Sequence, residues 1–395
     1  MRVTRTLRAT VGAALTGALL LTASGTASAD QVRKGQWPLE AFGAEQLWKE
    51  ATGKGVKVAV LDTGFRVTHQ DLKGQFLPGP DFGKETEKER AKALESGENT
   101  RDHGTAMSSI IAGHGHGPGG LAGVKGLAPD AKILPVPEYK NSGQATRWAA
   151  DHGADVINMS YVEDKTMDTC DSINYAVSKG VVVVASVGNE AVSDRQYPVG
   201  CPGVIGVGAV DEYGESADFN NYNSDTDLLA PGVKIPSATA KNDSDYQTRE
   251  GSSQATAYVS AAAALLKERF PDLTPGQIAN RLVKTAGLAQ AEKDKHLKLP
   301  DVHYGYGYIQ PGPALRKDIP PGPKEGPLPM PKKKASAQLD VGERDPNPPT
   351  GGKEILHRGL LYGGIGFGVL VVIGIIIAVV VAVRRRNNPG PQAWG

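Results

Sequence analysis

The 395-residue chain lacks an excess of charge of either sign, because its 44 lysine and arginine residues are matched by 43 aspartate and glutamate residues. Basic and acidic residues are mixed along the sequence, so it does not indicate the concentrated basic face of a nucleic-acid-binding protein. No internal repeat of fixed period is present either. These absences leave one large domain with appendages as the expectation for a chain of this length.

Cysteine is also scarce, with only Cys170 and Cys201 in the whole chain. In an exported protein, two cysteines meet an oxidising environment in which they can pair. Pairing requires Cα atoms less than about 7 Å apart, and sequence alone does not test that condition. A disulfide and two buried free thiols therefore remain as alternatives.

The first 29 residues have the three parts of a secretory signal peptide. Three arginines form a basic segment, an apolar stretch covers 11–21, and Ala27–Ala29 is a small-residue cleavage site. We expect cleavage before Asp30. An uncleaved anchor helix is the alternative.

A second apolar run, at 359–383, is long enough to cross a bilayer with some tilt. Three arginines follow at once, and basic residues favour the cytoplasmic side of a membrane. We therefore expect one transmembrane helix in the cell membrane, with the tail in the cytoplasm and the large domain outside. A buried core helix is the alternative, but one of this length would be expected to have charge on some face.

Between 311 and 358 the chain is rich in proline and charge and has almost no large apolar residues. Such a segment is not expected to build a core, and it suits a semi-extended spacer. The predicted organisation is a signal peptide at 1–29, an N-terminal extension at 30–55, a large domain at 56–310, a proline-rich linker at 311–358, a transmembrane helix at 359–383 and a cytoplasmic tail at 384–395.

Short, nearly continuous apolar runs alternate with helical patterns through the large domain. The runs are 56–62, 131–136, 155–160, 181–186 and 204–210. Continuous runs are expected for strands buried on both faces, so the pattern predicts an α/β domain with a mainly parallel sheet flanked by helices. Catalytic groups in such folds lie beyond the carboxyl ends of strands, where Asp62, Ser160 and Asn189 fall.

Asp62 opens an Asp-Thr-Gly sequence at the end of the first strand. This motif can be a polar turn, half of an aspartic protease dyad, or the orienting acid of a serine protease. The dyad requires a second Asp-Thr-Gly or Asp-Ser-Gly, and the sequence has none. A dimer of half-sites is hard to reconcile with a domain as large as 56–310.

Three polar residues suit the serine protease interpretation. His103 precedes small residues with apolar ones at helical spacing, which predicts a helix start; a surface or capping histidine is the alternative. Ser253 also stands at a predicted helix start, where free N–H groups stabilise an oxyanion, although an ordinary N-cap is the alternative. Asn189 closes a buried strand and can donate a second oxyanion hydrogen bond; a left-handed turn is the alternative.

No metal or cofactor is expected. His114 and His116 form a pair in a glycine-rich loop without further ligand spacing. No acidic loop has clear calcium-ligand spacing.

Taken in chain order, Asp62, His103, Asn189 and Ser253 resemble the subtilisin-like serine proteases, from about Lys57 to Ile309. The motifs that carry the resemblance are VAVLDTG, HGTAMSSIIAG, SVGNE, LLAPG and GSSQATA. The resemblance implies a three-layer fold and a triad in which Ser253 is the nucleophile, His103 the base and Asp62 the orienting acid. It implies an oxyanion hole formed by Asn189 and the Ser253 N–H.

The strand end at Asn158, Met159 and Ser160 resembles the family's substrate-binding strand, which implies backbone pairing with a protein or peptide substrate. The family commonly continues with Leu-Gly-Gly, whereas this chain has Tyr-Val-Glu at 161–163. Around the serine the family usually has Gly-Thr-Ser-Met-Ala-Thr-Pro, and here Gln254 replaces the apolar residue. No side-chain preference is therefore carried over.

The order of signal peptide, protease domain, proline-rich linker, membrane span and basic tail resembles the mycosins, as does the opening from Gln36. Mycosins are membrane-anchored subtilases associated with type VII secretion. The resemblance implies an extracellular, membrane-anchored endopeptidase, with a type VII secretion membrane complex among its partners. The alternative is a protease-like scaffold that stabilises such a complex with little or no turnover.

Overall fold

The computed structural model describes residues 31–80, 102–137, 142–294 and 296–329. The predicted signal peptide, transmembrane helix and cytoplasmic tail lie outside these residues. In the described part of the chain, no helix is long and apolar enough to cross a membrane.

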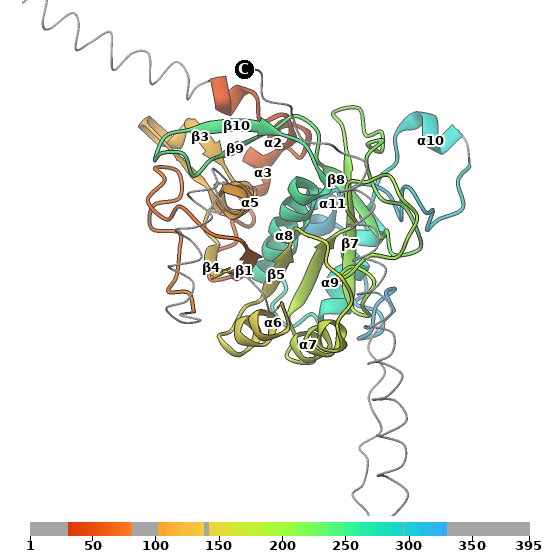
Figure 1. Cartoon of the computed structure of the whole chain (residues 1–395). Helices are drawn as coiled ribbons and strands as arrows, with labels where there is room; N and C mark the ends of the chain where they lie inside the picture. The colour runs from red at the N-terminus through yellow and green to blue at the C-terminus, as the bar shows by residue number, and fades with distance from the viewer. Residues whose placement is uncertain (1–30, 81–101, 138–141, 295, 330–395) are drawn as a thin grey trace, which may run out of the picture. The chain divides into compact units, whose positions relative to one another are not determined.

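Six parallel strands form the central sheet (Figure 1). In spatial order they are β4 (Lys132–Pro137), β1 (Lys57–Asp62), β5 (Val156–Met159), β6 (Val182–Ser186), β7 (Val204–Val210) and β8 (Leu228–Pro231). Every residue of β5, β6, β7 and β8 is buried. Burial on both faces explains the continuous apolar runs and confirms the predicted α/β fold.

Helices cover both faces of the sheet (Figure 1). Val58 and Val60 of β1 belong to the core beneath α5 (Asp102–Ala112) and α8 (Ser252–Arg269). Ala59 and Leu61, the alternate residues, belong to the core beneath α6 (Ser142–Asp151) and α7 (Met167–Ser178). This alternation is the two-residue period of a strand, and it gives the three layers predicted.

Helix α8 is the central helix of the first core, and its residues from Ser252 to Leu266 are all buried. Its many alanines and serines are small, which lets it contact β5, β6, β7 and β8. The remaining elements are α2 (Trp37–Ala41), α3 (Ala44–Leu47), β2 (His114–His116), η1 (Pro118–Gly120), β3 (Ala122–Lys125), β9 (Ile235–Ala238), β10 (Tyr246–Arg249), α9 (Pro275–Thr285), α10 (Gln290–Asp294) and α11 (Pro311–Arg316).

The N-terminal extension packs against the large domain. Leu39 and Leu47 of α2 and α3 are buried in the core that contains α8. The indole N–H of Trp37 donates to Val233 O at 3.1 Å, and that of Trp48 donates to Leu127 O at 2.9 Å. Residues 31–55 therefore fold with the domain, although they are mostly polar.

The domain also continues past the boundary predicted at residue 310, which lies too early in the chain. Ala314 and Leu315 of α11 are buried in the core, and so is Leu328. The guanidinium of Arg281 donates to three backbone carbonyls of this segment, those of Ala314, Lys317 and Ile319. A few apolar side chains and one buried cation thus hold residues 311–329, a part of the predicted linker, against the domain.

Candidate active site

Asp62 and His103, far apart in sequence, form a hydrogen-bonded pair. Asp62 is the last residue of β1 and His103 the second residue of α5. His103 Nδ1 lies 2.8 Å from Asp62 Oδ2, while the Thr63 N–H donates to Asp62 Oδ1 at 2.8 Å. Because the turn after the strand holds one carboxylate oxygen, the other is fixed toward the imidazole.

The start of α5 can lie close to β1 because Gly104 has no side chain. A Cβ there would collide with the carbonyl of Gly64 and lie 3.0 Å from Asp62 Cβ. The same helix start is linked to β10 by an ion pair between Asp102 and Arg249, and to the segment after β9 because Asp102 accepts from the Ala240 N–H at 2.7 Å. The histidine is thus tied to the segment that leads into α8.

The pairing with Asp62 changes the pKa of His103. Burial disfavours the imidazolium, but the charge of Asp62 and its hydrogen bond outweigh burial, so the pKa of His103 is raised above its ordinary value. An imidazole stabilised in its charged form in this way suits a group that takes a proton during a reaction.

Ser253, the second residue of α8, lies against the end of β5. Its hydroxyl donates to Ser160 O at 3.0 Å, and the Ser160 hydroxyl donates back to Ser253 O at 3.0 Å. No hydrogen bond joins Ser253 to His103 among the described residues. In this structure the serine hydroxyl therefore donates to a backbone carbonyl and not to the imidazole.

Asn189 has its side-chain oxygen fixed and its side-chain N–H₂ free of protein partners in the described chain. Asn189 Oδ1 accepts from Ser252 N and from Ser252 Oγ, both at 2.8 Å. Ser252 Oγ in turn lies 2.6 Å from Ser186 Oγ. Holding the acceptor end of the amide leaves its donor end, Nδ2, for a ligand. The sequence analysis missed this function of Ser252, and the only signal for it was the retained hydroxyl before Ser253.

The predicted substrate strand needs a correction at two of its three residues. Asn158 and Met159 pair with β1 on one side of β5 and with β6 on the other, so their backbone groups have no free edge for a substrate. The Asn158 side chain is buried and bonds to Ser160 and Ser260. Only Ser160, just past the ladder, has a carbonyl that faces the serine.

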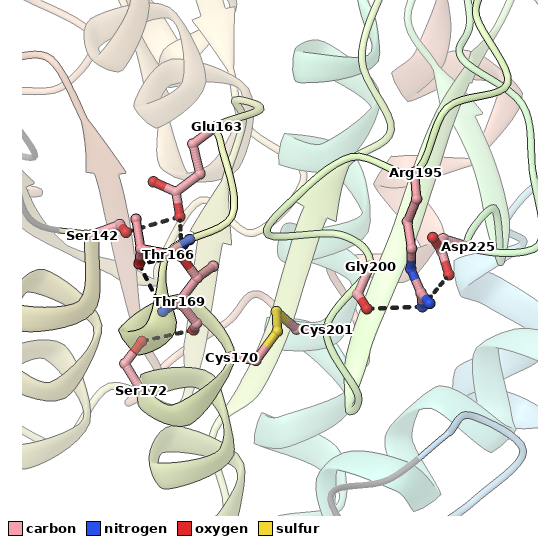
Figure 2. The surroundings of a disulfide bond; sticks show 10 residues. All are labelled: Ser142, Glu163, Thr166, Thr169, Cys170, Ser172, Arg195, Gly200, Cys201 and Asp225. Atoms are coloured by element: carbon pink, nitrogen blue, oxygen red, sulfur yellow. Dashed lines mark hydrogen bonds and ion pairs between the residues drawn. A yellow bond between two sulfur atoms is a disulfide. The ribbon is translucent and has the colours of Figure 1, made fainter. Parts of the chain in front are cut away.

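Cys170 and Cys201 are joined by a disulfide, with their Cα atoms 5.2 Å apart (Figure 2). The bond ties α7 to the loop that precedes β7. Of the two alternatives that the sequence left open, the structure therefore has the disulfide.

The segment after Ser160 is fixed beside this disulfide. The Glu163 carboxylate accepts from the hydroxyls of Ser142 and Thr169, at the starts of α6 and α7 (Figure 2). Burial raises the pKa of Glu163, and the two hydroxyl donors partly offset that rise. The Glu163 N–H donates to Tyr197 O at 2.7 Å. Glu163 is therefore held by both helices and by the disulfide-bonded loop.

Within the described residues, no group of three histidine, cysteine, aspartate or glutamate side chains is placed to hold a metal ion. His114 and His116, the pair noted in the sequence, have protein partners: His114 Nε2 lies 3.1 Å from Lys73 O, and His116 Nδ1 lies 2.6 Å from Asp71 Oδ1.

Comparison with known proteins agrees with this geometry. A model of the subtilase family of peptidases matches residues 53–307. Fervidolysin from Fervidobacterium pennivorans is 34% identical over 329 residues, which are 72% of this chain and 44% of fervidolysin. Subtilisin BL from Lederbergia lenta is 35% identical over 248 residues, which are 60% of this chain and 84% of that protein. The chain thus spans less than half of one of these relatives and most of the other.

Solved structures give the same result. The crystal structure of fervidolysin aligns with a TM-score of 0.60 at 31% identity, covering 72% of this chain and 46% of that one. The crystal structure of MycP1 from the ESX-1 type VII secretion system aligns with a TM-score of 0.57 at 29% identity, covering 74% of this chain and 88% of that one. The chain therefore belongs to the subtilase family.

Proposed function

We propose that this protein is a serine endopeptidase that hydrolyses peptide bonds through an acyl-enzyme formed on Ser253. The observation that carries the proposal is the 2.8 Å contact between His103 Nδ1 and Asp62 Oδ2. It fixes the imidazole with Nδ1 toward the carboxylate, which leaves Nε2 as the basic nitrogen. Ser253 is at the start of α8, the helix that contacts α5.

In the first step, Ser253 Oγ attacks the scissile carbonyl carbon while His103 Nε2 takes its proton. The imidazolium, stabilised by Asp62, then gives that proton to the leaving amine as the peptide C–N bond breaks. In the second step, water attacks the ester and the same nitrogen receives and returns a proton. The Ser253–acyl bond breaks and the enzyme is restored.

The developing oxyanion needs donors that are already in place. Ser253 is in the first turn of α8, so its N–H has no acceptor within the helix. Asn189 Nδ2 is the second donor, because Ser252 holds the opposite end of the amide.

Asn189→Ala is expected to lower kcat about a hundredfold or more, with little change in KM, because one oxyanion donor is lost. Asn189→Asp is the companion variant for positioning: it keeps the oxygen that Ser252 contacts but replaces the donor by a negatively charged oxygen, so it should lose at least as much. Steady-state kinetics on a fluorogenic peptide measure both variants. Unchanged turnover in Asn189→Ala would contradict the assignment of Asn189 to the oxyanion hole.

The pH profile should follow the titration of His103. The base must be neutral to accept a proton, and its pKa is raised above the ordinary 6.5. The acid limb of kcat/KM is therefore expected to have its midpoint above pH 6.5, with activity rising as pH increases through it. Rates measured from pH 5 to 9 test this. A midpoint below 6.5 would contradict the pairing of His103 with an ionised Asp62.

The proposed activity itself is tested by incubating the purified full chain with an unbiased peptide library and identifying products by mass spectrometry. We expect cleavage that disappears in Ser253→Ala. A folded wild-type chain that cleaves no peptide would contradict the proposal.

We further propose that the chain is exported and anchored in the cell membrane by residues 359–383, with the protease domain outside and the tail inside. The signal-peptide pattern at 1–29, the apolar run and the arginines that follow it support this topology. Association with a type VII secretion membrane complex is supported by the similarity to MycP1. Deletion of 359–383 should release the protein into the medium, whereas a wild-type chain found there intact would contradict the anchor.

A scaffold with little turnover is the second candidate. The observation that favours it is the Ser253 hydroxyl, which donates to Ser160 O rather than to His103. If the scaffold function dominates, cells that carry Ser253→Ala should secrete normally while cells that lack the gene do not.

A further inference from the structure

Gln254, the residue after Ser253, has a buried polar side chain that the proposed mechanism does not use. The residue is 3% exposed, and its Oε1 is buried without a hydrogen-bond partner. Among the described residues its Nε2 has no protein partner either. Leaving a buried polar group unpaired costs about 1–3 kcal/mol. Because an apolar side chain would avoid this cost, the amide needs an explanation.

The amide of Gln254 approaches the same point as that of Asn189. Gln254 is in the first turn of α8, where side chains lean back toward the N-terminus of the helix. A Cβ placed on Gly251 would lie 2.9 Å from Gln254 Oε1 and 3.4 Å from Asn189 Nδ2. Gly251 has a φ of 150° and no side chain, so the two amides lie close beside its Cα with no side chain between them. Gly251 itself lies two residues before Ser253.

An oxyanion bound beside Asn189 would interact differently with the two ends of the Gln254 amide. An oxyanion only accepts hydrogen bonds, so a carbonyl oxygen of Gln254 facing it would be repelled. A half-turn about the terminal carbon–carbon bond of the side chain presents Nε2 instead. That torsion has a broad, roughly two-fold preference, and the rotation breaks no hydrogen bond to the described protein.

We propose that Gln254 is a catalytic residue that donates a third hydrogen bond, from Nε2, to the oxyanion beside Asn189 Nδ2 and the Ser253 N–H. The unpaired amide then gains its partner when the tetrahedral intermediate forms, so the bond favours the reaction over the resting state. This inference rests on the proposed function, because it requires an acyl-transfer reaction at Ser253.

The test compares wild type, Gln254→Met and Gln254→Glu in kcat and KM from pH 5 to 9. Gln254→Met keeps the volume and loses the donor, so kcat should fall at least about tenfold with KM little changed. Gln254→Glu has the same shape but becomes a carboxylate. The ratio of its kcat to that of wild type should therefore be highest at pH 5 and fall as pH rises, a trend that loss of packing alone does not produce.

Gln290→Met, on the exposed surface of α10, is the matched control and should keep wild-type kinetics. Thermal melting confirms that each variant is folded at the assay temperature. Wild-type kcat in Gln254→Met, or a Gln254→Glu ratio that does not vary with pH, would overturn the inference while leaving the proposed function intact. A wild-type enzyme without any peptidase activity would instead overturn the proposed function.

Discussion

Ser253→Ala is expected to lower kcat for peptide hydrolysis by about a millionfold, the size of effect seen when a subtilase loses its nucleophile. Removing the hydroxyl leaves no atom that can form the acyl-enzyme, and the remaining rate comes from the oxyanion donors and substrate binding alone. The variant should fold normally, because alanine fits the start of a helix whose first residues are buried and small.

A double variant gives this prediction its sharpest form. Ser253 and His103 act as one unit, so Ser253→Ala with His103→Ala should be about as slow as either single variant. Ser244→Ala is the control, because Ser244 is an exposed loop serine that contacts Asn242. The assignment of the nucleophile would be contradicted if the fold-loss in kcat of the double variant were the product of the two single losses. Turnover near the wild-type value in Ser253→Ala would also contradict it.

Asp62→Asn is expected to lower kcat by about ten-thousandfold near neutral pH, as in the template triad. The fold should survive, since asparagine has the same shape and can keep an oxygen toward the Thr63 N–H. The end that faces His103 then becomes a donor, which stabilises the tautomer with its proton on Nε2 and removes the basic nitrogen. The pKa of His103 should also fall, because the charge that raises it is lost.

The chain contains a matched control for this variant. Asp71 is a second buried aspartate paired with a histidine, and its Oδ1 lies 2.6 Å from His116 Nδ1. Asp71→Asn should reduce stability in the melting experiment but leave kcat per folded molecule unchanged. If Asp62→Asn and Asp71→Asn lowered kcat equally, Asp62 would be a structural residue and not the orienting acid.

The sequence predicted those parts of the structure that depend on local pattern. Continuous apolar runs predicted the buried parallel strands, and the motif around Asp62 predicted its place at a strand end. The partnership of Asp62 with His103 came from family resemblance, since no periodicity joins residues 41 positions apart, and the structure brings the two side chains to 2.8 Å.

Other features depend on which strands become neighbours, and local pattern does not contain that information. The order β4-β1-β5-β6 places β5 between two partners, which is why Asn158 and Met159 have no free edge for a substrate. The contact of Ser252 with Asn189 joins residues 63 positions apart. Part of what holds 311–329 is Arg281, whose hydrogen bonds to backbone carbonyls leave no signal in composition.

The most direct test of the central claim is labelling of the purified full chain with a fluorophosphonate probe, followed by mass spectrometry of the peptide that contains Ser253. The probe reacts only with a serine activated by its neighbours, and it needs no knowledge of the natural substrate. We predict one label, on Ser253, absent from Ser253→Ala and strongly reduced in Asp62→Asn. A folded wild-type chain that takes up no label under conditions that label Subtilisin BL, or a label on another residue, would contradict this account of the active site.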